Sequence, residues 1–139
     1  MTVFTAGVWD LFHVGHLNLL RNAARLGDSL QVGVLTDEAA AAYKETPVIP
    51  FIQRIRIIQN LDVVTQAVGV NNTDATELMQ GSTMVPEDIV LVHGDDHTPD
   101  WEIGQTWVQN AGGLFVLLPY TAGISTTSIK ERIKAKGAK

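Results

Sequence analysis

The chain has 139 residues, of which 45% are hydrophobic and 18% are charged, enough for one globular domain with its own core. Its net charge of -5 at pH 7 argues against a nucleic-acid partner, because binding nucleic acid requires a basic surface. The sequence has no cysteine, which excludes disulfides and thiolate metal sites. It also has no apolar run of about 18 residues and no basic leader, so we expect a cytoplasmic protein without a membrane partner.

Segments with strand-like and helix-like periodicity alternate along the chain, separated by short polar breaks. Strands are predicted at residues 2–6, 30–35, 63–70, 89–92 and 114–118. Helices are predicted at residues 16–26, 51–61, 100–110 and 125–132, with a helical turn near 76–79 and loops at 36–38 and 44–47. This alternation predicts an α/β fold in which residues 1–139 form a single domain. We expect a doubly wound sheet of about five parallel strands with helices on both faces.

Polar and glycine-containing segments follow four of the predicted strands. They are residues 7–16, 36–46, 94–97 and 119–127. Ligands of parallel α/β sheets bind beyond the carboxyl ends of the strands. We therefore expect these four segments to meet at one edge of the sheet and to form the functional site.

Two histidines, His13 and His16, stand where the first strand passes into the first helix. A helix start offers backbone N–H groups and a partial positive charge to a phosphate, and Gly15 allows a ligand to approach the backbone. Histidine nitrogens can also stabilise the charge that develops on a phosphoryl group. The alternative is a zinc site with His93 or His97 as a third ligand. Phosphate is favoured because the H-E-x-x-H pattern is absent, so no metal ligands are assigned.

The first of these segments resembles the opening signature of the nucleotidylyltransferase superfamily. Its sequence is Gly7-Val8-Trp9-Asp10-Leu11-Phe12-His13-Val14-Gly15-His16. The resemblance implies a Rossmann-like fold in which His13 and His16 bind the triphosphate and stabilise the transition state at the α-phosphorus. It also implies that Gly7, Val8, Trp9 and Gly15 bind nucleotide. Trp9 replaces the usual phenylalanine and is equally well read as a core anchor, and Asp10 is expected to orient a catalytic group or the acceptor.

A second segment resembles the G-I-S-T-T signature of small cytidylyltransferases of the glycerol-3-phosphate cytidylyltransferase type. Gly123 permits a tight turn, and Ser125 and Thr126 offer hydroxyls and amides at a helix start, which suits the β- and γ-phosphates. The predicted nucleotide-binding residues here are Thr121, Gly123, Ile124, Ser125, Thr126 and Thr127. The resemblance adds Gly94 and Asp95 near the nucleoside.

Three further residues are assigned by the same resemblance to the reacting phosphates and the acceptor. Lys44 matches a phosphate-binding lysine before the second long helix and is expected to be catalytic. Asp10, Lys44, Arg54 and Tyr120 are the predicted acceptor-binding residues. Tyr120 departs from the family pattern, which has an arginine before the threonine, so a positive charge near the nucleotide is lost. That departure weakens glycerol 3-phosphate as the acceptor more than it weakens the reaction class.

The resemblance implies an enzyme that transfers CMP from CTP to a small phosphate- or phosphonate-bearing acceptor and releases pyrophosphate. It also implies a homodimer, with Mg2+ carried on the triphosphate. The alternative on the same fold is an adenylyltransferase that uses ATP and a sugar phosphate. Two other classes are a nucleotide-binding regulatory module without catalysis and a metal-binding module. The sequence leaves open the acceptor and whether the chain is one domain of a longer enzyme.

Overall fold

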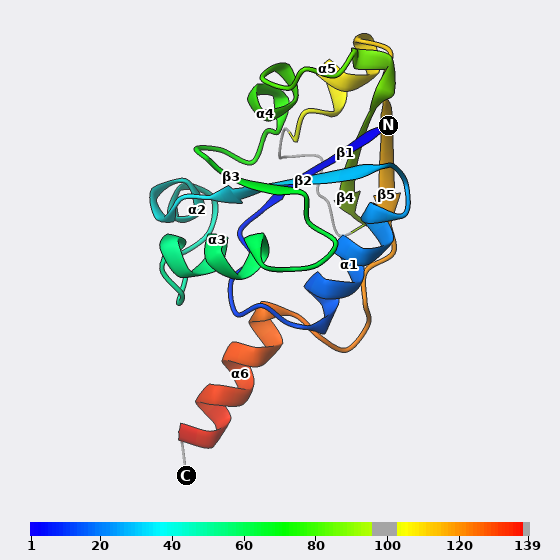
Figure 1. Cartoon of the computed structure of the whole chain (residues 1–139). Coiled ribbons are helices and arrows are strands. Elements are labelled where there is room, and N and C mark those ends of the chain that lie inside the picture. The colour runs from blue at the N-terminus through cyan, green and yellow to red at the C-terminus, as the bar shows by residue number, and fades with distance from the viewer. Residues whose placement is uncertain (96–102, 138–139) are drawn as a thin grey trace.

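A single five-stranded sheet forms the centre of the computed structural model, which describes residues 1–95 and 103–137 (Figure 1). Its strands are β1 (Thr2–Gly7), β2 (Ser29–Leu35), β3 (Gln66–Val70), β4 (Ile89–Gly94) and β5 (Leu114–Leu118). Every neighbouring pair is parallel, and the order is β3-β2-β1-β4-β5. This order confirms the predicted Rossmann-like α/β fold, with β1 in the middle.

Alternate side chains of the central strand pack into different layers of the core. Val3 lies in a cluster with Leu20 of α1 (Val14–Ala24) and Ile58 of α3 (Phe51–Gln59). Phe4 lies in another cluster with Met79 of α4 (Thr76–Gln80) and Val108 of α5 (Gln105–Asn110). Because successive strand residues point to opposite faces of a sheet, α1 and α3 cover one face, and α4 and α5 cover the other, as Figure 1 shows.

The sequence-based prediction of a loop after β2 is wrong, because a helix, α2 (Asp37–Tyr43), begins there. The Thr36 side chain accepts a hydrogen bond from the Ala39 N–H at 3.2 Å, which caps the helix. Asp37 and Glu38 place negative charge in its first turn, and a run of alanines follows. An alanine run has no apolar periodicity, so the pattern that reveals longer helices was missing.

Other boundaries also differ from the predicted ones. The third strand begins at Gln66, because Leu61 and Val64 belong to a turn closed by the Val64 N–H on the Leu61 carbonyl. Helix α5 begins at Gln105, after Gly104, whose φ of +99° favours glycine. The predicted helix began at residue 100, and residues 100–102 lie outside the described residues. A short 3-10 helix, η1 (Pro86–Asp88), leads into β4.

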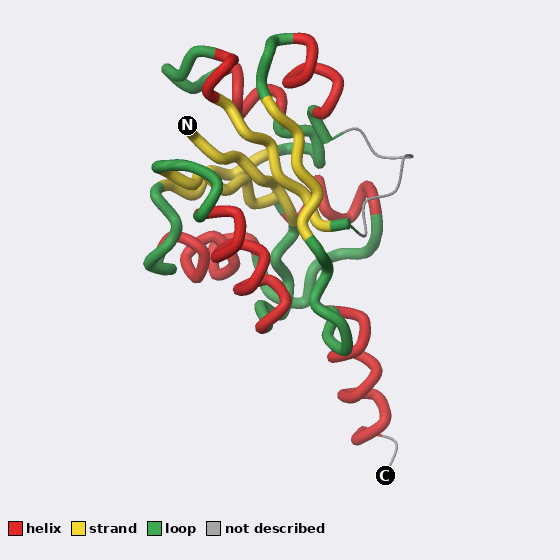
Figure 2. The backbone as a smooth tube through the Cα atoms, turned by 90° about the vertical axis from the view of Figure 1, so that its right-hand side faces the viewer, coloured by secondary structure: helices red, strands yellow, loops and turns green. Residues whose placement is uncertain are grey.

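The last helix, α6 (Thr126–Gly137), extends away from the sheet and runs five residues past its predicted end at 132. Figures 1 and 2 both show its carboxyl end projecting from the body of the protein, and it contributes no buried residue. Only its first turns lie against the rest of the fold. None of the described helices is long and apolar enough to cross a membrane.

Arg54 of α3 holds three separate segments together from inside the protein. Its guanidinium donates to the Ile49 carbonyl at 2.8 Å, to the Val8 carbonyl at 2.7 Å and to Asp37 Oδ1 at 2.8 Å. The arginine side chain is fully buried, whereas Asp37 is 44% exposed. Sequence reasoning assigned Arg54 to the acceptor, but its donors are used within the fold. The residue fixes the α2–α3 connection and the loop after β1.

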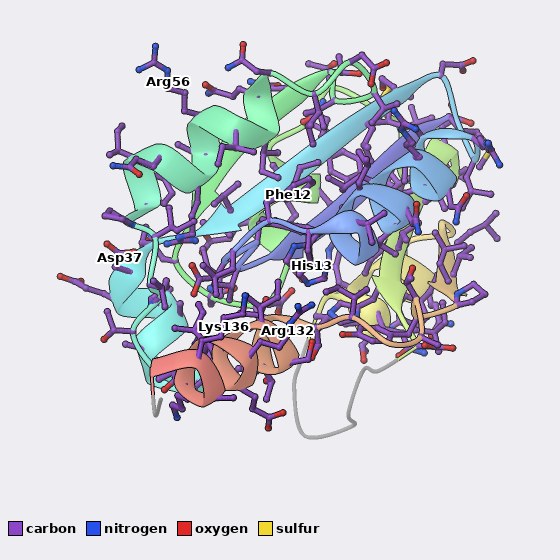
Figure 3. All side chains as sticks on the ribbon, turned by 90° about the horizontal axis from the view of Figure 1, so that it is seen from below. Phe12, His13, Asp37, Arg56, Arg132 and Lys136 are labelled. Carbon is purple, nitrogen blue, oxygen red and sulfur yellow. The ribbon has the colours of Figure 1, made fainter. Side chains whose placement is uncertain are left out.

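Replacing Arg54 with methionine is expected to lower the free energy of unfolding by about 3 kcal/mol, because the two carbonyls and Asp37 lose their partner. Chemical denaturation of both proteins measures this difference. Arg56→Met is the matched control, because Arg56 lies on the same helix and points away from the protein (Figure 3). Equal stabilities of the Arg54→Met and Arg56→Met proteins would contradict the role of Arg54 in holding the three segments together.

Candidate active site

A cavity of about 350 Å³ lies beyond the carboxyl ends of β1 and β4, at the point where the chain turns to opposite sides of the sheet. Its volume is within the usual range of small-ligand sites. Most of the predicted site residues line it, namely Gly7, Val8, Trp9, Asp10, His13, Gly15, His16, Lys44, Gly94, Tyr120, Thr121, Ser125, Thr126 and Thr127. The fold thus brings together two motifs that are more than a hundred residues apart.

The loop that carries the histidines has an unusual backbone. Trp9 has a φ of +58° and Leu11 a φ of +48°, a left-handed region that bulky residues rarely adopt. The Trp9 indole N–H donates to the Gly33 carbonyl at 3.0 Å, and the residue is 5% exposed. A Cβ on Gly7 would lie 3.0 Å from that ring, a tight contact that glycine avoids. Trp9 is therefore a core anchor and a wall of the cavity at once.

Each histidine uses one ring nitrogen to cap the start of α1. The Gly15 N–H donates to His13 Nδ1 at 3.0 Å, and the His13 N–H donates to His16 Nδ1 at 3.3 Å. A neutral imidazole that accepts at Nδ1 carries its hydrogen on Nε2. This reciprocal cap therefore fixes the tautomer of both rings and leaves each with an Nε2–H donor.

Both imidazoles are held in the uncharged form. The two imidazole rings stack with their centroids 3.8 Å apart. The centroids of the Trp9 and Phe12 rings lie 5.5 and 5.4 Å from that of His16. Burial lowers the pKa of His13, and burial together with the charge of His13 lowers the pKa of His16 to about 3, against a smaller opposing effect of Asp10. At neutral pH the pair acts as two N–H donors and brings no net charge.

Gly15 allows the two motifs to meet. A Cβ at this position would lie 2.9 Å from His13 Cε1 and 3.2 Å from Ile124 Cγ2. Ile124 therefore lies against the histidine motif instead of lining the cavity. The Thr121 hydroxyl accepts from the Asn18 side chain at 3.2 Å, which also ties this segment to α1.

Asp10 joins three segments around the cavity. Its carboxylate accepts from the N–H groups of Leu11, Val48 and Ile49 at 3.1, 2.8 and 2.9 Å. Its carbonyl oxygen accepts from the Thr126 hydroxyl at 2.9 Å. Asp10 is 5% exposed, so these contacts are shielded from water. The observed role of the carboxylate is to position the loops that carry the histidines and Lys44.

The start of α6 forms the opposite wall. Ser125 caps the helix by accepting from the Ser128 N–H at 2.9 Å, while the Ser125 N–H donates to the Ser128 hydroxyl at 2.9 Å. Gly123 has a φ of +83°, which provides the turn before the helix. The positive end of this helix, at Thr126 and Thr127, lies on the cavity and suits an anion.

Asp95 does not line the cavity. It is exposed, and its carboxylate accepts from the Tyr120 N–H at 2.8 Å while its own N–H donates to the Leu118 carbonyl. It thus positions Tyr120, which does line the cavity. His93 lines the cavity as well, whereas Asp96 and His97 lie outside the described residues. Within residues 1–95 and 103–137, no three His, Cys, Asp or Glu side chains are placed to hold a metal ion.

Sequence reasoning missed Lys130, Tyr43, Glu45 and Thr73, which also line the cavity. Lys130 lies four residues after Thr126, so the two share one face of α6, and this spacing was a usable signal. Lys130 Nζ lies 2.6 Å from Glu45 Oε1. Nothing in the sequence links Thr73, in the segment after β3, to the site.

The parallel sheet brings paired imidazole donors, a lysine and a helix start to one cavity, as expected for a member of the nucleotidylyltransferase superfamily. A family model described as cytidylyltransferase-like matches residues 4–132, and the chain belongs to this family.

Curated relatives extend the comparison. The chain is 36% identical over 137 residues to the bifunctional protein HldE of Halorhodospira halophila, and 37% identical over 139 residues to that of Geotalea uraniireducens. These alignments cover 97% and 99% of the chain but only 28% of each relative. A solved structure titled as a lipopolysaccharide core biosynthesis protein from Thermoplasma volcanium superposes with a TM-score of 0.65 over 87% of this chain and 96% of that one, at 23% identity. It supports the fold.

His16→Gln is expected to keep the helix cap but to remove the titrating imidazole. Glutamine at this position can accept from the His13 N–H, as in a capping box. In the native protein, the lowered pKa of His16 means that the unfolded state binds a proton first, so stability falls as the pH drops from 6.5 toward about 3. The variant loses this contribution, at most about 1.4 kcal/mol per pH unit. Urea unfolding measured from pH 7 to pH 4 tests it. If the free energy of unfolding falls equally with pH in the native protein and in the variant, His16 is not held neutral.

Proposed function

We propose that this chain transfers AMP from ATP to a small sugar phosphate and releases pyrophosphate. The sequence motifs predicted CTP and a phosphate- or phosphonate-bearing acceptor, and we take the alternative, ATP and a sugar phosphate, instead. Similarity to bifunctional HldE proteins along nearly the whole chain supports ATP and a sugar phosphate better than CTP. The G-I-S-T-T element favours CTP, which therefore stays as the second candidate.

Tyr120 supports a purine nucleotide. It stands where the cytidylyltransferase pattern has an arginine, lines the cavity and is 44% exposed. Its backbone N–H donates to the Asp95 carboxylate at 2.8 Å, which holds the backbone of this residue beside the cavity. A base stacks on an exposed aromatic ring, and a purine offers a larger face than a pyrimidine.

The observation that carries the proposal is the pair of Nε2–H donors on the same cavity as Lys44 and the start of α6. An oxygen of the sugar phosphate attacks the α-phosphorus of ATP, and the bond from that phosphorus to the bridging oxygen breaks. The electron pair leaves with pyrophosphate. The attacking oxygen is already an anion at neutral pH, so no general base is needed.

The residues act by positioning and by stabilising charge. His13 and His16 donate to the α-phosphate oxygens, on which charge builds in the transition state. Lys44 and the α6 start hold the β- and γ-phosphates that leave. Mg2+ enters as part of the substrate, MgATP. The homodimer suggested by the family resemblance is part of the proposal and stays a prediction.

Pyrophosphate release is expected with MgATP and a sugar phosphate, and at least about tenfold slower with MgCTP. A panel of both nucleotides against sugar 1-phosphates, glycerol 3-phosphate and a small phosphonate measures this preference. Turnover with CTP and glycerol 3-phosphate or the phosphonate, but not with ATP, would contradict the proposal in favour of the second candidate. Nucleotide binding without turnover under any condition would indicate a regulatory module.

Two substitutions at His13 separate catalysis from helix capping. His13→Ala removes both the cap and the Nε2–H, whereas asparagine is a good cap that lacks this donor. Both variants are expected to lose about 100-fold or more in turnover, the usual loss for one transition-state donor. Only His13→Ala is expected to lose about 1 kcal/mol of stability. Near-normal turnover of His13→Asn would remove His13 from the catalytic site.

A further inference from the structure

An ion pair crosses the cavity between two elements that are far apart in the sequence. Lys130 Nζ of α6 lies 2.6 Å from Oε1 of Glu45, which follows α2. Both residues line the cavity. The pair therefore lies at the rim of the candidate site, with its carboxylate open to solvent.

The two partners differ in how strongly they depend on each other. The Lys130 side chain is 24% exposed and that of Glu45 is 74% exposed. A largely buried ammonium needs an anionic partner, whereas an exposed carboxylate is readily hydrated. Lys130 also lowers the pKa of Glu45, through its hydrogen bond first and its charge second, so the carboxylate stays ionised. The Glu45 carboxylate is therefore an anionic partner of Lys130 that another anion can replace at a small cost in free energy.

The segment that carries Glu45 is anchored on both sides. The Lys44 N–H donates to the Ala40 carbonyl at 3.0 Å, and the Val48 N–H donates to Asp10 at 2.8 Å. Between these anchors, the contact with Lys130 ties the segment to α6. Lys130 also shares a helix face with Thr126, at the end of α6 that suits an anion. A phosphate at this end of the helix would lie one helical turn from Lys130, on the same face.

We propose that the Glu45 carboxylate is an internal competitor that occupies Lys130 until a substrate phosphate displaces it. Lys130 is then a phosphate-binding residue, and the ion pair is a latch that opens on binding. The inference rests on the proposed function only in requiring a phosphate-bearing ligand. That phosphate belongs either to the nucleotide or to the acceptor, and the two are distinguished by the probe.

The test is calorimetric titration of the full chain with pyrophosphate, with MgATP and with glucose 1-phosphate. Glu45→Gln is expected to bind the relevant probe roughly two- to fivefold more tightly, because the competing anion is removed. Lys130→Met is expected to bind it at least about tenfold more weakly. In the double variant, Glu45→Gln is expected to have no further effect. Changes with pyrophosphate and MgATP assign the nucleotide phosphates, and changes with glucose 1-phosphate alone assign the acceptor.

Two control variants match the changes in charge. Glu38→Gln alters an exposed carboxylate on α2, and Lys136→Met alters an exposed lysine nearer the carboxyl end of α6; neither lines the cavity. Both are expected to leave binding unchanged.

Unchanged or weaker binding of all three probes by Glu45→Gln would overturn the latch. So would a gain in affinity that persists in the Lys130→Met background. Binding is measured without turnover, so a failure of the proposed reaction would leave this result readable.

Discussion

The site depends on one buried carboxylate that accepts hydrogen bonds from backbone groups of two loops. Asp10 holds its own loop through Leu11 and the α2–α3 connection through Val48 and Ile49, while its carbonyl receives the Thr126 hydroxyl of α6. Buried backbone N–H groups require partners, and here a single residue supplies them for both loops. The histidines, Lys44 and the start of α6 consequently face the same cavity. Arg54 ties the same connection to the loop after β1 by donating to the Ile49 and Val8 carbonyl oxygens.

This framework explains how uncharged histidines can serve phosphoryl chemistry. The left-handed backbone at Trp9 and Leu11 is unfavourable alone and is compensated by the Trp9–Gly33 and Asp10 hydrogen bonds. Because both Nδ1 atoms are used in the cap, the rings cannot turn without losing it. In the proposed reaction, two fixed N–H donors would stabilise developing charge without reorganising. A protonated pair at 3.8 Å would repel itself, so neutrality is part of the design.

The parallel sheet and the meeting of the two motifs follow from the sequence, because the carboxyl ends of parallel strands share one edge. Helix α2 could not be predicted from periodicity, since alanines have no apolar face to reveal. The roles of Arg54 and Asp95 depend on backbone groups from distant segments, which a residue pattern does not display. Lys130 could have been found from its spacing to Thr126, whereas its pairing with Glu45 forms only when α6 packs beside the α2–α3 connection. The motifs predict the reaction class, whereas the proposal of ATP as the nucleotide rests on Tyr120 and on the similarity to curated relatives.

The central claim is that two neutral imidazoles donate to the α-phosphate of the nucleotide. A crystal structure of the complex with a non-hydrolysable ATP analogue tests it most directly. The expected result places α-phosphate oxygens within about 2.7–3.2 Å of Nε2 of both His13 and His16, with the Nδ1 caps intact. An α-phosphate bound elsewhere, with both Nε2 atoms facing only solvent, would contradict the account.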